Sequence, residues 1–160
     1  MPHEKVIEEI DTECNRIDKL FQEYESLLEK IKEQEPDFIE IGSLAMMLHS
    51  FYNGIESIFS RIAKKIDKNM PDGSEWHKEL LELMAKPTKK RKYAVLSETM
   101  CEELKVYLGF RHFSRHAYAF DLDWNLMKDL VYRADDVREK VLGEIKSFIE
   151  KIKKKELRSS

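Results

Sequence analysis

Five side chains suited to phosphate and proton chemistry lie in one short segment, GFRHFSRHAYAFDLDW. They are Arg111, His112, Arg115, His116 and Tyr118. A guanidinium offers a planar fork of donors to phosphate oxygens, and an imidazole titrates near neutral pH and can transfer protons. An unpaired buried arginine is strongly unfavourable, so these groups are expected to face water, a partner molecule or a substrate.

An arginine and a histidine suffice in principle to cleave RNA without a metal ion. The histidine takes the proton of the ribose 2′-hydroxyl or gives one to the leaving 5′-oxygen, and the arginine stabilises the charge that grows on phosphorus. On a continuous helix, Arg111 and His116 would lie about 140° apart and flank one broad face. A single histidine supplies only an acid or a base, whereas two copies of the site across a two-fold axis would supply both.

Two pairs of residues allow more than one interpretation. His112 and His116 have the one-turn spacing of a zinc-binding helix, but neither the metalloprotease glutamate nor a third ligand accompanies them. We therefore expect no metal site. Trp76 and His77 are expected to pack, with Trp76 anchoring a short helix, and a role in the site is the alternative.

Three carboxylates are candidates for supporting roles. Glu56 is either exposed or paired with Arg111 or Arg115, as a carboxylate that holds an active-site arginine would be. Asp121 and Asp123 are expected to cap the last helix rather than to take part in catalysis.

Two apolar stripes with alternating steps of three and four residues predict two long helices at the start of the chain. The first helix should end near Pro36, where Asp37 and Glu40 form a capping-box pattern that opens the second. The segment NMPDG at 69–73 should end the second helix. The stripes consist of Ile10, Cys14, Ile17, Phe21, Tyr24, Leu28 and Ile31, and of Ile41, Ala45, Leu48, Tyr52, Ile55, Phe59, Ile62 and Ile66.

Three more helices are predicted in the remainder of the chain. A short one over SEWHKELLELM has Ser74 as a candidate cap, a long one runs from about Ser97 through Tyr118, and the last starts after Asp121 or Asp123. The basic tail from about 151 is expected to fray. Four long helices and one short helix, joined by short links, indicate an all-α, up-and-down four-helix bundle that forms a single domain over residues 1–160.

The composition excludes several classes of protein. The chain has 160 residues, 42% hydrophobic and 37% charged, with 5 glycines and 4 prolines, which argues against a turn-rich β-sandwich and against a disordered chain. No apolar run approaches 18 residues, so no membrane span is predicted. Cys14 and Cys101 fit neither a disulfide framework nor a zinc spacing, which favours a reducing cytoplasm.

Charge is unevenly distributed along the chain. Residues 1–40 carry 5 basic and 13 acidic side chains, and residues 86–160 carry 18 basic and 12 acidic ones. The stretch KPTKKRKY is predicted to be a loop, in which Lys89, Lys90, Arg91 and Lys92 either guide RNA phosphates or form a solvated surface. Such contacts would raise affinity without selecting a sequence.

Beyond the individual residues, the sequence resembles the HEPN superfamily, and within it the HepT-like ribonuclease toxins. Arg111 and His116, with four residues between them, match the HEPN motif, and Tyr118 completes the longer form Arg-x4-His-x-Tyr. The segments FYNGIESIF, MPDGSEWHKELLELM, YAVLSETMCEEL and YLGFRHFSRHAYAFDLDW follow the order and spacing of HepT-like domains over roughly residues 40–150.

The resemblance implies a metal-independent endoribonuclease toxin that needs no cofactor. Members of the family are helical bundles that form homodimers and place the Arg/His motif of each subunit in a shared cleft. Arg111 and His116 would then be catalytic, supported by His112, Arg115 and Tyr118. The usual partner is a minimal nucleotidyltransferase antitoxin, which in some systems transfers AMP to the motif tyrosine, here Tyr118. The alternative is a non-catalytic HEPN module that binds nucleotide, RNA or a partner protein.

Overall fold

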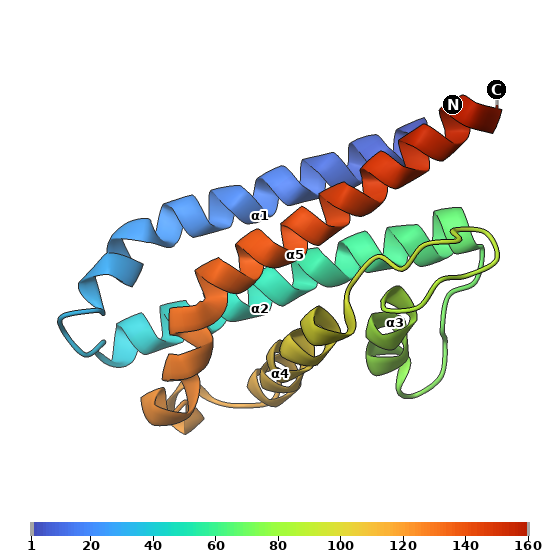
Figure 1. Ribbon diagram of the computed structural model, residues 1–160. Coiled ribbons are helices and arrows are strands. Elements are labelled where there is room, and N and C mark those ends of the chain that lie inside the picture. Colours follow the sequence, from blue (N-terminus) through green and yellow to red (C-terminus); the bar gives the residue numbers. More distant parts are fainter. Residues whose placement is uncertain (1, 160) are drawn as a thin grey trace.

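The computed structural model describes residues 2–159, which form an all-α bundle with no strand in this range. Figure 1 shows four long helices that alternate in direction, with the short α3 beside α2 and α4 and with both chain ends at the same end of the bundle. The predicted all-α fold and the order of its helices are confirmed. The helices are α1 (Glu4–Lys30), α2 (Phe38–Arg61), α3 (Trp76–Met84), α4 (Glu98–Ser114) and α5 (Trp124–Ser159).

The first two helices form as the apolar stripes predict. Ile10, Cys14, Ile17 and Phe21 of α1 are buried against the core. The predicted capping box opens α2: the Glu40 amide donates to the Asp37 carboxylate at 2.8 Å, and the Asp37 amide donates to the Glu40 carboxylate at 3.1 Å.

Helix α2 is the central element because its apolar surface is broad enough to contact each of the other four helices. Its end is irregular: a π-helical turn, η1 (Ile62–Asp67), continues it, and Lys68 then adopts a left-handed conformation with φ of 58°. The chain leaves the helix there, just before the predicted breaker segment 69–73.

Three boundaries differ from the prediction. Helix α3 begins at Trp76 with Glu75 at the N-cap position and without a side-chain cap, so Ser74 does not have the predicted role. Helix α4 ends at Ser114 rather than at Tyr118. The tail from 151 is helical to Ser159 instead of frayed, because Ile152 continues the buried stripe of α5 at 3% exposure.

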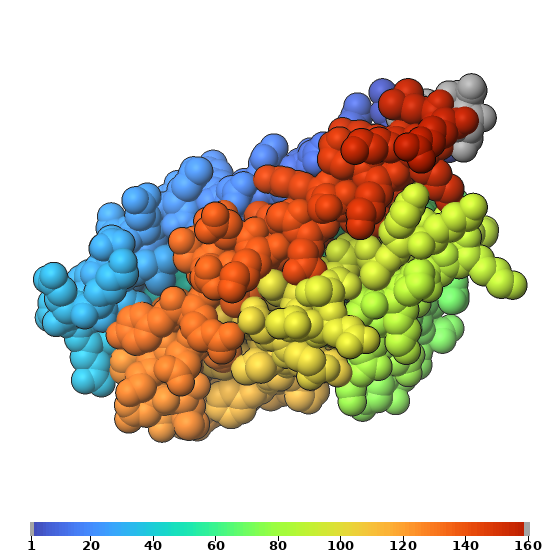
Figure 2. All heavy atoms as spheres, viewed as in Figure 1, coloured from blue at the N-terminus to red at the C-terminus, as the bar shows by residue number. Residues whose placement is uncertain are grey.

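The surface view shows α1 and the later part of α5 lying side by side along one face (Figure 2). The start of α5, coloured orange, lies at the lower end of the molecule in this view. In the described part of the chain, no helix is long and apolar enough to cross a membrane.

Candidate active site at the C-terminal end of α4

Helix α4 is defined by local bonds at both of its ends. The Ser97 hydroxyl caps its start by accepting from the Met100 amide at 3.1 Å. At its other end the His116 amide donates to the Phe113 carbonyl at 3.2 Å, so the bonding tightens from a step of four residues to a step of three. The Ser114 hydroxyl donates to the Arg111 carbonyl at 3.2 Å, so it competes with the Arg115 amide, which donates to the same carbonyl at 3.1 Å. Arg111 therefore lies within the helix, whereas His116 lies in the turn that follows, and their predicted relation on one continuous helix does not hold.

The Arg111 side chain is held against α2. Its Nε donates to the Asn53 side-chain oxygen at 2.5 Å, and its Nη2 lies 4.0 Å from the Glu56 carboxylate. The Arg111 side chain is 13% exposed, and Glu56 is buried. The position of Glu56 matches one of the two alternatives, pairing with Arg111. An arginine fixed at Nε by a neutral amide keeps the outer edge of its guanidinium in a defined direction.

Glu56 has a second and closer partner in α3. Its Oε2 lies 2.7 Å from Nδ1 of His77. The neighbouring Trp76 ring stacks on the imidazole, with ring centroids 3.6 Å apart. One buried carboxylate thus connects a histidine of α3 with an arginine of α4, and this contact ties both helices to α2.

An open pocket of about 580 Å³ lies between α3 and α4. Much of its lining can donate hydrogen bonds or carry positive charge, which suits an anionic ligand. A groove of about 630 Å³ between α1 and α5 is larger, but six carboxylates line it and would repel a phosphodiester. The pocket is lined by Glu75, by Trp76, His77 and Lys78 of α3, by Lys105, Arg111 and His112 of α4, and by Arg115 just after α4.

His116 and Tyr118 lie beyond the lining of this pocket. The His116 ring contacts the His112 ring edge to face, with centroids 6.0 Å apart, and His116 is exposed. Tyr118 is 71% exposed and stacks on Phe120 at 5.2 Å. Within the chain the structure thus brings together Arg111, His112 and Arg115, with His116 at their margin and Tyr118 on the adjacent surface.

The positive charges at this end of α4 interact favourably with the helix dipole. The last carbonyls of a helix carry partial negative charge, which the guanidinium groups of Arg111 and Arg115 offset. His49 of α2 lies within their field, and its pKa is lowered below the ordinary value by burial and by the charges of Arg111 and then Arg115. Burial raises the pKa of the Tyr52 phenol, with the Glu56 carboxylate adding to the shift.

The two predicted carboxylate caps lie in the turn between α4 and α5. The Asp123 carboxylate accepts from the Asn125 amide at 2.9 Å at the start of α5. The Asp121 carboxylate accepts from the Tyr118 amide, also at 2.9 Å, and stabilises the short 3-10 turn η2 (Ala119–Asp121). Asp121 therefore caps this turn instead of the last helix as predicted, because the chain makes a separate turn before α5 begins.

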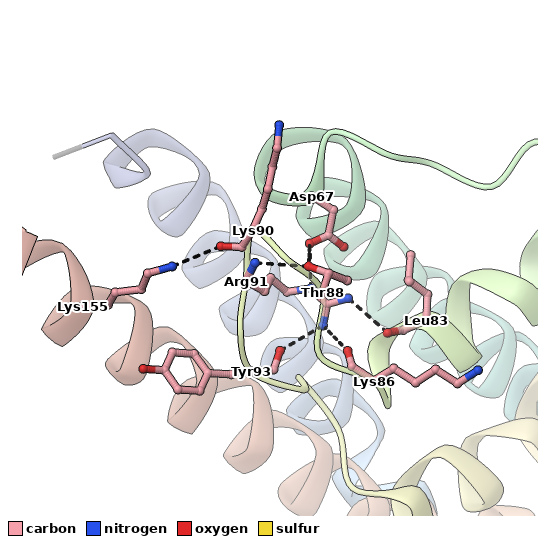
Figure 3. Close-up of polar contacts among 8 residues, drawn as sticks. All are labelled: Asp67, Leu83, Lys86, Thr88, Lys90, Arg91, Tyr93 and Lys155. Carbon is pink, nitrogen blue, oxygen red and sulfur yellow. Dashed lines mark hydrogen bonds and ion pairs between the residues drawn. The ribbon is translucent and has the colours of Figure 1, made fainter.

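The basic loop between α3 and α4 differs from the prediction at one residue. Arg91 is fully buried, and its Nε donates to Asp67 at 2.7 Å, so it cannot guide RNA phosphates. Figure 3 shows its guanidinium between the loop backbone and the end of α3, where it donates to the carbonyls of Lys86 and Tyr93 in the loop and of Leu83 in α3 at 3.0–3.2 Å. Arg91 fastens the loop to the end of η1.

The lysines of the same loop remain exposed, but they are not brought to the pocket. Lys89, Lys90 and Lys92 are all solvent-accessible. They precede α4, whereas Arg111 lies near its other end, and a helix of 17 residues is about 25 Å long. The loop lies instead beside the C-terminal end of α5 (Figure 2), where the Lys155 amine donates to the Lys90 carbonyl at 3.2 Å.

Two residues near the site are not among the predicted site residues, His49 and Asn53. A signal for them exists in the sequence, because His49, Asn53 and Glu56 recur at steps of four and three and so form a polar stripe on α2. His77, for which a role in the site is the alternative to packing, lies in the lining of the pocket, but its link to Glu56 joins two helices and has no signal in the sequence. No group of three or more metal-ligating side chains occurs within the described residues.

Comparison with known proteins gives one family. No curated protein and no solved structure matches the chain significantly. A family model described as HepT-like protein matches residues 43–152, from the first turns of α2 to near the end of α5. The match covers more than half of the chain and includes the whole polar stripe of α2, the pocket and the Arg111–Tyr118 segment. The chain therefore belongs to the HepT-like family.

Proposed function

We propose that the protein is an endoribonuclease toxin that cleaves RNA without a metal ion, with Arg111 and His116 as its catalytic residues. One observation carries the proposal: guanidinium and imidazole groups gather at an open pocket in a member of the HepT-like family. His112 and Arg115 line that pocket beside Arg111 and act as supporting phosphate ligands.

The proposed reaction uses only the substrate's own nucleophile. A base removes the proton of the ribose 2′-hydroxyl, and the 2′-oxygen bonds to phosphorus as the bond to the 5′-oxygen breaks. An acid returns a proton to that 5′-oxygen, which leaves a 2′,3′-cyclic phosphate and a 5′-hydroxyl. His116 performs one of the proton transfers, and Arg111 stabilises the negative charge on the pentacoordinate phosphorus.

The surface around the motif supports a homodimer. Phe113, Tyr118 and Phe120 are 51%, 71% and 75% exposed on and just after the end of α4. Exposed aromatic side chains gathered in one region are typical of protein–protein contacts. A two-fold axis beside this region would place a second His116 and a second Arg111 opposite the first pair.

The same surface supports control by a nucleotidyltransferase antitoxin that modifies Tyr118. The Tyr118 side chain is 71% exposed, so its hydroxyl is reachable by an AMP-transferring enzyme. A transferred AMP would add bulk and negative charge next to His116, where the RNA phosphate must enter, and would oppose binding of the substrate.

The test is a cleavage assay with purified protein, structured RNA and EDTA. The wild type should give products ending in cyclic phosphate, and His116→Ala should reduce cleavage by roughly 100-fold or more while folding and dimerising normally. His3→Ala is the matched control, because His3 lies in the N-terminal turn and pairs with Glu156 at 2.6 Å. Undiminished cleavage by His116→Ala would refute the assignment.

The alternative function is a HEPN module that binds a nucleotide or RNA without cleaving it. The fixed position of Arg111 on Asn53 and Glu56 favours it, since a rigid guanidinium binds phosphate whether or not cleavage follows. In the same assay, this alternative gives RNA binding that depends on Arg111 and no products.

A further inference from the structure

His77, the histidine of the pocket that comes from α3, has the surroundings of an acid–base group rather than those of a residue that only packs. His77 lines the pocket, and its side chain is 25% exposed. Its Nδ1 lies 2.7 Å from the Glu56 carboxylate, whose side chain is 10% exposed. A carboxylate accepts hydrogen bonds, so Nδ1 carries the proton in the neutral ring and Nε2 keeps a free lone pair.

The orientation of the His77 ring is fixed from two directions. The bond to Glu56 sets the direction of Nδ1, and the Trp76 ring stacked at 3.6 Å holds the plane. Nε2 lies on the far side of the ring from the buried carboxylate. A buried carboxylate that orients an imidazole, whose other nitrogen is free, is the arrangement that selects a tautomer and stabilises the imidazolium in general base catalysis.

The same carboxylate also approaches the proposed phosphate ligand. Glu56 Oε1 lies 4.0 Å from Nη2 of Arg111, while Glu56 Oε2 contacts His77. The two groups are therefore attached to one anchor, and both line the pocket between α3 and α4. A phosphodiester bound by Arg111 in this pocket would have an imidazole beside it that does not come from the motif.

We propose that His77, positioned by Glu56, faces the phosphodiester in the α3–α4 pocket and is the second acid–base group of the site, acting as the base. This inference rests on the proposed function. His77 Nε2 would take the proton of the 2′-hydroxyl, the 2′-oxygen would bond to phosphorus, and the 5′-oxygen would leave with a proton from the imidazolium of His116 or its symmetry mate. After product release, His77 would return its proton to water and the neutral His116 would take one from water, so that both groups regain their starting forms. One protomer would then contribute both a base and a phosphate ligand.

The decisive variant is His77→Asn, whose amide nitrogen takes the place of Nδ1 and keeps a donor for Glu56 but removes Nε2. We expect the cleavage rate to fall by roughly 100-fold or more with an unchanged urea midpoint, and added imidazole to restore part of the activity of His77→Ala. Glu79→Gln, on the exposed face of α3, is the control and should cleave like the wild type. Wild-type cleavage by a folded His77→Asn would overturn the proposal.

The positioning role of Glu56 has its own readout, the tautomer of the His77 ring, which the NMR shifts of the ring nitrogens report. Because Glu56 accepts from Nδ1 at 2.7 Å, the neutral ring of the wild type should carry its proton on Nδ1. Glu56→Leu offers no acceptor and should lose this preference, whereas Glu56→Gln keeps an accepting oxygen and should keep it together with more of the cleavage rate. The same tautomer in all three proteins would refute this role.

A binding experiment distinguishes failure of this inference from failure of the proposed function. The probe is a 2′-deoxy dinucleotide, which carries the phosphodiester but lacks the nucleophile, and the readout is the NMR signal of the His77 ring. A wild type that binds the probe but cuts no RNA would refute the proposed function. In that case a shift of the His77 signal on binding would support its place beside the phosphodiester, and an unshifted signal would overturn it. RNA cleavage that depends on His116 but not on His77 would refute only the inference.

Discussion

Replacing Arg91 by methionine removes a fully buried charge while keeping a long, unbranched side chain. In the native fold its guanidinium pairs with Asp67, whose side chain is 2% exposed, and it also donates to two loop carbonyls and to the Leu83 carbonyl of α3. Removal of one partner of a buried pair costs about 3–5 kcal/mol, because the other charge is left uncompensated. That is a large share of the roughly 5–15 kcal/mol by which a native domain is stable.

The assay is equilibrium urea unfolding followed by circular dichroism, together with thermal melting. For a chain of this size, a loss of about 3–5 kcal/mol lowers the melting temperature by roughly 6–20 °C. Lys90→Met is the matched control from the same loop; its side chain points away from the Arg91 cluster in Figure 3, so the expected change is within about 0.5 kcal/mol.

A double-mutant cycle then separates the ion pair from the packing. If the Asp67–Arg91 pair is the main contribution, Asp67→Leu with Arg91→Met should cost less than the sum of the two single changes, because neither charge is then left alone. A loss below about 1 kcal/mol for Arg91→Met, or strictly additive single changes, would refute the reasoning that this buried pair fastens the loop.

Three further predictions concern α2. Burial and the charge of Arg111 lower the pKa of His49, so Arg111→Gln should raise it toward the ordinary value in an NMR titration, and an unmoved pKa would refute their proximity. Since unfolded His49 keeps its ordinary pKa of about 6.5, the native state should lose stability as the pH falls through that value. A Cβ added at Gly54 would lie 2.8 Å from Ile17 Cγ1, so Gly54→Ala should destabilise the fold by about 1–2 kcal/mol despite the better helix propensity. Gly143→Ala meets no atom within 4 Å and should be neutral or stabilising by up to about 1 kcal/mol; equal urea midpoints for the two variants would contradict the close approach of α1 and α2.

The helices were predictable because burial selects a repeated spacing of apolar residues. The stripes of α1, α2 and α5 are visible in the sequence, and the core uses them, down to Ile152 in the tail that was expected to fray. The end of α4 was not predictable in the same way, since no glycine or proline stops it. It ends where Ser114 bonds back to the Arg111 carbonyl, and many mid-helix serines do the same without ending a helix.

The positions of individual charges were the least predictable part, because they depend on contacts between distant segments. Arg91 lies in a run of four basic residues, of which it alone is buried. It is also the one arginine among three lysines, and a guanidinium suits a buried ion pair better than an ammonium does, but this signal does not identify the partner. Its partner Asp67 is 24 residues earlier, at the end of a π-helical turn. The link between Glu56 and His77 spans 21 residues and requires that α3 already lie against α2.

The polar stripe of α2 explains how a helical bundle can hold a reactive cluster in one position. Asn53 is partly buried and Glu56 is buried on a helix that packs most of its apolar side chains into the core, where an unpaired amide or carboxylate would be unfavourable. Each therefore requires a partner, Asn53 from α4 and Glu56 from both α3 and α4. Sliding α3 or α4 along α2 would break these bonds, whereas apolar contacts alone tolerate such shifts. The bonds that fix the register of the helices are thus the same bonds that orient Arg111 and His77, so the geometry of the pocket is set by the packing of the bundle.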